Sequence, residues 1–232
     1  MKLRILIADD HEVVRHGLCR LLQAHEGWQI CGEAKDGREA VQMAKDLKPD
    51  VVILDVGMPN LNGLAATRQL MQHDANLKVI VLTITDTDQV IREALDAGAR
   101  GFVLKSDAAR DLVSAVEALQ RNRMFFTSRV NDMVLAGFLD KGHGPFKGET
   151  SKLPKLTPRE SEVIQLLAEG KSSKEVACIL NLSTKTAETH RSNIMRKLDF
   201  HSIRDLVVYA VKNNIIQVEM PQSSNDSNGS AA

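Results

Sequence analysis

Short apolar runs alternate along residues 1–123 with segments whose apolar residues recur at helical spacing. Such alternation restricts the fold to a parallel α/β sheet with helices on both faces. The run Val51–Leu54 is apolar at every position, as expected for a strand that is covered on both faces. We therefore predict a five-stranded, doubly wound parallel sheet, with strands at 3–8, 29–33, 51–55, 78–83 and 101–104 and helices at 11–24, 37–47, 63–73, 87–97 and 107–121.

Four of these apolar runs end in polar residues, namely Asp9-Asp10, Asp55, Thr83 and Lys105. Because the carboxyl ends of parallel strands share the edge where ligands bind, we expect these side chains to form one pocket. Clustered carboxylates repel one another unless a cation neutralises them, and Mg²⁺ prefers oxygen ligands. The pocket therefore suits Mg²⁺ and a phosphoryl group, with Asp55 as a nucleophile that could form an acyl phosphate.

The other two polar residues have roles in the same chemistry. Lys105 would pair with the transferred phosphate as a compact point charge, and Thr83 could donate a hydrogen bond to one of its oxygens. The alternative is that strand-end Asp and Thr merely cap the following helices. Capping explains any one of these residues, but it explains poorly why all four positions stand at the correct strand ends.

Residues 155–216 contain no strand-like alternation and are predicted to form an all-α domain of four helices. The first begins with Thr157 as N-cap, Pro158 at the first helical position and Glu160 completing a capping box. A second short helix ends near Leu180, and Ser183 caps a third. Two helices joined by so tight a turn indicate a helix-turn-helix.

The third of these helices would be the recognition helix, whose side chains meet base edges and phosphates. Its outward residues are Lys185, Glu188, Thr189, Ser192, Arg196 and Lys197. Residues 150–215 carry 11 Lys/Arg against 7 Asp/Glu, a balance of +4, whereas residues 1–127 carry 16 against 18, a balance of −2. This excess is modest for DNA binding, and charge alone leaves open an ordinary solvated helix face.

The remaining segments are predicted from composition. Residues 124–154 read as a linker with one helix at 128–139, and residues 217–232 as a disordered tail. No run approaches the roughly 18 apolar residues of a membrane helix, and the N-terminus carries no signal-peptide pattern. The three cysteines lack metal-type spacing and are expected to be buried thiols, so a cytoplasmic protein without membrane contact is expected.

Residues 1–121 resemble the receiver domain of two-component response regulators, a flavodoxin-like fold. The resemblance is carried by Asp9-Asp10, the segment 54–63, Thr83 and the segment 97–105. It implies that Asp55 accepts a phosphoryl group from a sensor histidine kinase. It also implies that Asp10, Asp55 and the Gly57 carbonyl ligate Mg²⁺, with Asp9 acting partly through the metal's water shell.

The resemblance assigns Phe102 as the switch aromatic, which moves inward when the threonine closes on the phosphate. The alternative for Phe102 is a buried strand phenylalanine. Two positions depart from the wider family. Ser106 stands where many receivers have a cis proline. Gly57 lacks the side chain that shields the phosphate in many relatives, so we hypothesise an altered acyl-phosphate lifetime.

Residues 156–198 resemble the LuxR-type helix-turn-helix domain, and the chain up to about residue 216 resembles the NarL/FixJ class of response regulators. The resemblance implies that Lys185, Glu188, Thr189 and Ser192 face the major groove of promoter DNA. It also implies that residues 202–213 form a helix used in dimerisation. Glu188 stands where many members have a basic residue, and could accept from cytosine N4. For His190 we favour a packing or capping role.

The expected function is therefore a phosphorylation-controlled transcription regulator that forms a homodimer when phosphorylated or bound to DNA. One rival is an enzyme, such as a phosphatase with an acyl-phosphate intermediate. That class needs a second acid or base beside the nucleophile, and Gly57, two positions after Asp55, supplies none. A second rival is a regulator that works without phosphorylation, which the complete pocket argues against.

Overall fold

The computed structural model describes residues 2–127, 129–133 and 156–216. The predicted tail at 217–232 and most of the predicted linker lie outside the described residues. In the described part of the chain, no helix is both long enough and apolar enough to span a bilayer.

The N-terminal domain is built on a five-stranded sheet in the order β2-β1-β3-β4-β5, with every pair parallel. The predicted fold class is therefore confirmed. The central strand β3 is buried along its whole length, as its uninterrupted apolar sequence predicted. The strand bounds are β1 Leu3–Ala8, β2 Trp28–Ala34, β3 Val51–Asp55, β4 Lys78–Thr83 and β5 Gly101–Leu104.

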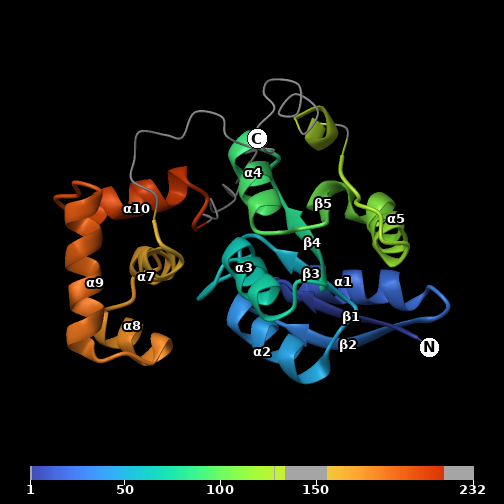
Figure 1. Cartoon of the computed structure of the whole chain (residues 1–232), viewed down its shortest axis with the longest axis horizontal. Coiled ribbons are helices and arrows are strands. Elements are labelled where there is room, and N and C mark those ends of the chain that lie inside the picture. The colour runs from blue at the N-terminus through green and yellow to red at the C-terminus, as the bar shows by residue number, and fades with distance from the viewer. Residues whose placement is uncertain (1, 128, 134–155, 217–232) are drawn as a thin grey trace, which may run out of the picture.

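Helices cover both faces of this sheet (Figure 1). Their bounds are α1 Glu12–Gln23, α2 Gly37–Leu47, α3 Gly63–His73, α4 Asp88–Asp96 and α5 Ala108–Gln120. Apolar residues of α2, α3 and α4 form one core cluster with one face of the sheet, and those of α1 and α5 form another with the opposite face. The two clusters fix the strand ends, and hence the polar residues there, on one edge.

Local sequence explains where the helices begin and end. Asp36 accepts hydrogen bonds from the first amides of α2, and Asn62 and Thr87 do the same for α3 and α4. Gly98 follows α4 with φ of +96°, a backbone angle that favours glycine.

The segment after α5 stays attached to the sheet beyond residue 123. The amide of Phe102 donates to the Phe125 carbonyl (2.9 Å), and the amide of Phe125 donates to Arg100 (3.0 Å). Residues 129–133 are helical and cover part of the predicted helix at 128–139. Val130 is fully buried and belongs to the core cluster that α2, α3 and α4 form with one face of the sheet. Arg129 forms ion pairs with carboxylates at the start of α4.

The C-terminal domain contains α7 Pro158–Ala168, α8 Ser173–Leu180, α9 Thr184–Lys197 and α10 Ile203–Lys212 around one apolar core. Thr157 and Glu160 form the predicted capping box, and Ser183 caps α9 as expected. Cys178 is exposed on α8, so the expectation of three buried thiols is wrong there. The short helix turns Val176 and Ala177 to the core and therefore leaves the next position outside.

Candidate phosphoacceptor site and DNA-binding surface

The polar residues at the strand ends meet in one pocket, as the sequence predicted. Asp9 and Asp55 end neighbouring strands and are 0% and 1% exposed. Ligand atoms of Asp9, Asp10, His11 and Asp55 all lie within 4.8 Å of one another. Carboxylates this close repel one another unless a cation lies among them.

Lys105 supplies a cation between two of these carboxylates. Its Nζ lies 2.8 Å from Asp9 Oδ2 and 3.1 Å from Asp55 Oδ1. The residue begins a short 3₁₀ turn directly after β5, which carries the ammonium across the edge of the sheet. Lys105 thus neutralises part of the negative charge of Asp9 and Asp55.

Burial dominates the protonation of the acceptor candidate. It raises the pKa of the Asp55 carboxyl from 3.8 to about 6, against the stabilising charge of Lys105, and the neighbouring Asp9 adds to the rise. A backbone hydrogen bond from Gly57 also favours the ionised carboxylate. For Lys105, burial opposes the charge, but Asp55 and Asp9 together hold its pKa above 10.5. The pocket therefore favours the charged form of Lys105 and disfavours the ionised form of Asp55.

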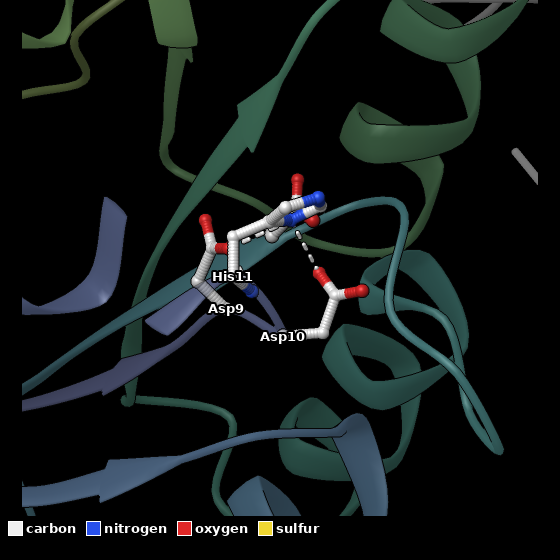
Figure 2. A group of neighbouring side chains, drawn as sticks. Asp9, Asp10 and His11 are labelled. Carbon is white, nitrogen blue, oxygen red and sulfur yellow. Dashed lines mark hydrogen bonds and ion pairs between the residues drawn. The ribbon is translucent and has the colours of Figure 1, made fainter. Parts of the chain in front are cut away.

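His11 and Arg15 belong to this site although the sequence pattern did not place them there. The Nδ1 atom of His11 lies 2.9 Å from Asp10 Oδ1 and 3.4 Å from Asp9 Oδ1 (Figure 2). The guanidinium of Arg15 donates to the Asp9 carbonyl at 2.7 Å. His11 directly follows the acidic pair in the sequence, and Arg15 lies one helical turn later. This proximity was the sequence signal that could have placed both residues at the site.

The donor set fits a hard divalent cation. Asp9 Oδ2, Asp10 Oδ1 and Asp55 Oδ1 are buried and accept no assigned hydrogen bond within the described part of the chain, although Asp10 Oδ1 lies 2.9 Å from His11 Nδ1. The first and last of these oxygens instead face the Lys105 ammonium. Several carboxylate oxygens close together match the ligands that Mg²⁺ takes in proteins. The acidic cluster is therefore consistent with a metal site.

Thr83 and Phe102 lie where the sequence placed them, at and beside the same edge. The Thr83 hydroxyl is buried and donates to the Thr85 carbonyl at 2.9 Å, so it is held within its own loop. Phe102 is 1% exposed and packs in the core cluster with α4. The peptide between Lys105 and Ser106 is trans, as are all those in the described residues.

The β3–α3 loop, residues 56–62, folds back tightly on the acceptor strand. The amide of Gly63 donates to the Val56 carbonyl at 3.1 Å. A Cβ atom at Gly63 would lie 2.1 Å from the backbone oxygen of Asp55, so only glycine fits there. The main chain of Asp55 is thus in direct contact with the far end of the loop.

The predicted recognition helix presents most of its chosen residues to solvent. Lys185, Glu188, Thr189, Ser192 and Arg196 are exposed on α9, whereas Ala187 and Ile194 are buried in the domain core. Lys197 is partly buried, and its Nζ lies 2.6 Å from Glu160 Oε2 on α7. His190 is half-buried. The exposed residues of this set recur every three or four positions, so they lie along one side of α9.

Comparison with known proteins matches both domains. Residues 5–117 match the family "Response regulator receiver domain", and residues 154–210 match "Bacterial regulatory proteins, luxR family". The chain is 36% identical over 214 residues to the transcriptional regulatory protein LiaR of Bacillus subtilis, covering 92% of this chain and 99% of LiaR. It is 34% identical over 217 residues to the response regulator protein VraR of Staphylococcus aureus, covering 94% and 100%.

Solved structures give the same result. The RcsB response regulator of Salmonella typhimurium superposes with a TM-score of 0.61 at 29% identity, covering 91% of this chain and 98% of RcsB. A structure of the RcsB–DNA complex superposes with a TM-score of 0.54 at 31% identity, covering 90% and 98%. LiaR is a transcriptional regulatory protein and VraR and RcsB are response regulators, so the chain belongs with regulators and not with the rival class of enzymes. The chain belongs to the two-component response regulators that join a receiver domain to a LuxR-type DNA-binding domain.

Proposed function

We propose that Asp55 accepts a phosphoryl group from a sensor histidine kinase in a Mg²⁺-dependent reaction, and that this controls homodimerisation and promoter binding in the cytoplasm. The observation that carries the proposal is the buried Asp55 carboxylate, held by Lys105 within 4.8 Å of further carboxylates at the strand ends. RcsB has been solved in complex with DNA and as dimers bound to DNA, which supports the same roles for this chain.

In the proposed transfer, an Asp55 oxygen attacks phosphorus while the bond from phosphorus to the kinase histidine nitrogen breaks. The product is an acyl phosphate, and the electron pair of the broken bond leaves on the imidazole. Lys105 already touches Asp55 and would then pair with a phosphate oxygen. Thr83 would turn its hydroxyl from the Thr85 carbonyl to the phosphate. Phe102, on the neighbouring strand β5, would then change the position of its side chain.

Asp9, Asp10, Asp55 and the Gly57 carbonyl are the groups that would hold Mg²⁺. When bound, the metal would neutralise the carboxylates and draw charge from the phosphoryl oxygens. Gly57 places no side chain over the acceptor, so water would reach the acyl phosphate more freely than in relatives that carry one there.

The proposal is tested by DNA binding with and without a small phosphodonor and Mg²⁺. Genome-wide footprinting of the purified protein identifies its sites, and titration of one such site measures affinity. Phosphodonor treatment should tighten binding at least about tenfold, corresponding to about 1.4 kcal/mol. Equal affinity with and without the donor, in protein shown to be phosphorylated, would favour the rival regulator that works without phosphorylation.

The DNA-binding surface gives a separate prediction. Lys185→Ala and Ser192→Ala should each weaken binding to an identified site by about 1–3 kcal/mol if they contact bases. Lys35→Ala, which removes an exposed lysine from the receiver, is the matched control and should bind as the wild type does. Unchanged affinity in both α9 variants would show that α9 is wrongly assigned as the recognition helix.

The effect of Gly57 on the lifetime of the acyl phosphate can be tested by kinetics. Gly57→Asn should slow loss of phosphate from Asp55, because an amide side chain beside the acceptor would restrict water. The decay of the phosphorylated protein after removal of the donor gives the rate. An unchanged rate would count against a role for position 57 in phosphate lifetime.

A further inference from the structure

A cavity of about 450 Å³ lies between the receiver and the DNA-binding domain. One side of α3 forms one wall and the N-terminal part of α7 forms the other, and the two helices lie side by side (Figure 1). Its charged lining comes from three helices, with Lys45 on α2, Arg68 on α3, and Arg159 and Glu162 on α7. Small-molecule sites in proteins typically have volumes of about 300–1,000 Å³, so the cavity is large enough for a ligand.

Hydrogen bonds between the two domains hold the walls of this cavity together. The Oε1 atom of Gln165 on α7 accepts from the Asn62 amide of the receiver at 2.8 Å. Both carboxylate oxygens of Glu169 accept from the Asn60 amide, at 3.1 and 3.2 Å. Gln165 is 1% exposed, so this contact is closed to solvent. The cavity therefore belongs to the docked chain and to neither domain alone.

The charged lining contains more cations than anions. Lys45, Arg68 and Arg159 stand against one carboxylate, that of Glu162. Glu93 lies 3.6 Å from Arg68, but it is on α4 and does not line the cavity. Lys45 forms no hydrogen bond or ion pair within the described part of the chain. The positive charge at this place is therefore not balanced by the lining itself.

The one carboxylate of the lining is already occupied by hydrogen-bond donors. The Oε1 atom of Glu162 accepts from Gln69 at 2.9 Å, and its Oε2 accepts from Arg159 at 2.8 Å. The Ser161 hydroxyl and the Gln72 amide group also line the cavity, and among the described residues neither has a side-chain partner. The cavity thus offers more donors than its own acceptors can meet, and an anion would supply the missing acceptors.

Basic side chains at a protein surface are often merely solvated, and any one of these residues alone would be interpreted in that way. Here the cations line a concave site, they come from helices of two domains, and the only carboxylate among them is already hydrogen-bonded. Charges of one sign gathered in a cleft strengthen the local potential and attract ions of the opposite sign. The arrangement therefore favours an anionic ligand over bulk water.

A phosphate group suits this lining better than a carboxylate does. A phosphomonoester carries about 1.5–2 negative charges at pH 7 and has three acceptor oxygens that point in different directions. Because Lys45, Arg68 and Arg159 belong to three helices, they can meet oxygens on different sides of the group. A carboxylate offers only two oxygens in one plane. Ala65 and Pro158 add apolar surface to the lining, which suits the organic part of such a ligand.

We propose that this cavity binds a small organic phosphate, which bridges α2 and α3 of the receiver to α7 of the DNA-binding domain. The ligand contacts both domains only while they are docked, so its binding stabilises the docked arrangement by mass action. This goes beyond the proposed role of Asp55, because binding here needs neither phosphorylation nor a metal ion. The chain thereby responds to the concentration of a soluble phosphate compound as well as to a kinase.

The test uses the full chain, titrated with glycerol 3-phosphate and followed by the amide chemical shifts of an NMR spectrum. Metal-free buffer keeps the ligand from a metal at Asp55, and constant ionic strength keeps the screening of charges equal. Saturable shifts are expected on both walls, at Gln72 on α3 and at Ser161 on α7. Glycerol, which lacks the phosphate, should cause none, and glycerate, which has a carboxylate instead, should bind at least about tenfold more weakly.

Lys45→Ala should weaken the binding of glycerol 3-phosphate about three- to thirtyfold, between the effect of an exposed ion pair and that of a hydrogen bond to a charged group. Lys35→Ala is the matched control, because it removes an exposed lysine of the same domain that does not line the cavity. Both lysines are exposed, so both variants should fold, which circular dichroism checks.

Equal affinities of Lys45→Ala and Lys35→Ala for glycerol 3-phosphate would overturn the proposal, as would the absence of saturation up to about 10 mM. Shifts confined to the receiver would refute the bridging of the two domains, and equal binding of glycerate would refute the choice of phosphate. Because the titration involves no phosphoryl transfer, its result stands whether or not Asp55 proves to be the acceptor.

Discussion

Asp55→Asn should take up no phosphoryl group from a small phosphodonor with Mg²⁺, while the wild type is labelled. The amide lacks the anionic oxygen that attacks phosphorus, and no other carboxylate of the pocket ends the central strand. Phosphate incorporation followed by intact-mass spectrometry measures the difference. Asp46→Asn, which changes an exposed carboxylate on α2, should be labelled as the wild type is. Labelling of Asp55→Asn would refute the assignment of the acceptor.

The same substitution should raise the free energy of unfolding at pH 7 in metal-free buffer. Folding raises the pKa of Asp55 from 3.8 to about 6, so its ionisation opposes the folded state. One pKa unit corresponds to about 1.4 kcal/mol, which makes the gain at most about 3 kcal/mol. The stability that the neutral Asp55 carboxyl contributes is therefore fully present below the unfolded pKa of 3.8, and it is lost as pH rises through the folded pKa of about 6.

Urea unfolding between pH 4 and 7 measures this pH dependence. The wild type should lose stability relative to Asp55→Asn across that interval, and millimolar Mg²⁺ should reduce the loss because it binds only the folded pocket. If the free energy of unfolding depended on pH in the same way in the two proteins, burial would not raise the pKa of Asp55. Burial of the ionised Asp55 carboxylate would then have no measurable effect on the free energy of unfolding.

The receiver and its pocket could be predicted from sequence because each depends on local patterns. Apolar runs fix the strands, and the residue type at the end of each run fixes what lies at the edge of the sheet. Once the sheet is parallel in the order β2-β1-β3-β4-β5, Asp55 and Lys105 follow strands that end at the same edge, with β4 between them. The register of β3 with β1 and β4 then brings their ends together.

The interdomain contacts could not be predicted in this way. Gln165 and Glu169 read as ordinary polar positions of an amphipathic helix, which face water in most small domains. Asn60 and Asn62 read as turn residues, which they also are, with Asn60 at φ of +63°. Nothing in the spacing of one domain specifies the backbone amides of another. His11 was missed for a related reason, because its ring reaches the site from a helix start rather than from a strand end.

Lys105→Met should destabilise the metal-free protein by about 3–5 kcal/mol at pH 7, because two buried carboxylates lose the lysine ammonium that lies between them. Methionine keeps much of the apolar stem, so the loss reports the charge. Urea unfolding measures it, with Lys35→Met on the receiver surface as control, expected within about 0.5 kcal/mol of wild type.

The pairing of Lys105 with Asp55 can be separated from its pairing with Asp9 by a double variant. In the Asp55→Asn background, Asp9 is the one carboxylate of the two that remains a buried anion beside Lys105. Lys105→Met should therefore lower the free energy of unfolding by less in that background than in the wild type. The difference between the two costs is the coupling energy, expected at about 0.5–3 kcal/mol. Equal costs in both backgrounds would mean that Lys105 serves Asp9 alone. It would then have to move to Asp55 only when phosphate arrives, which the 3.1 Å contact in the unphosphorylated protein argues against.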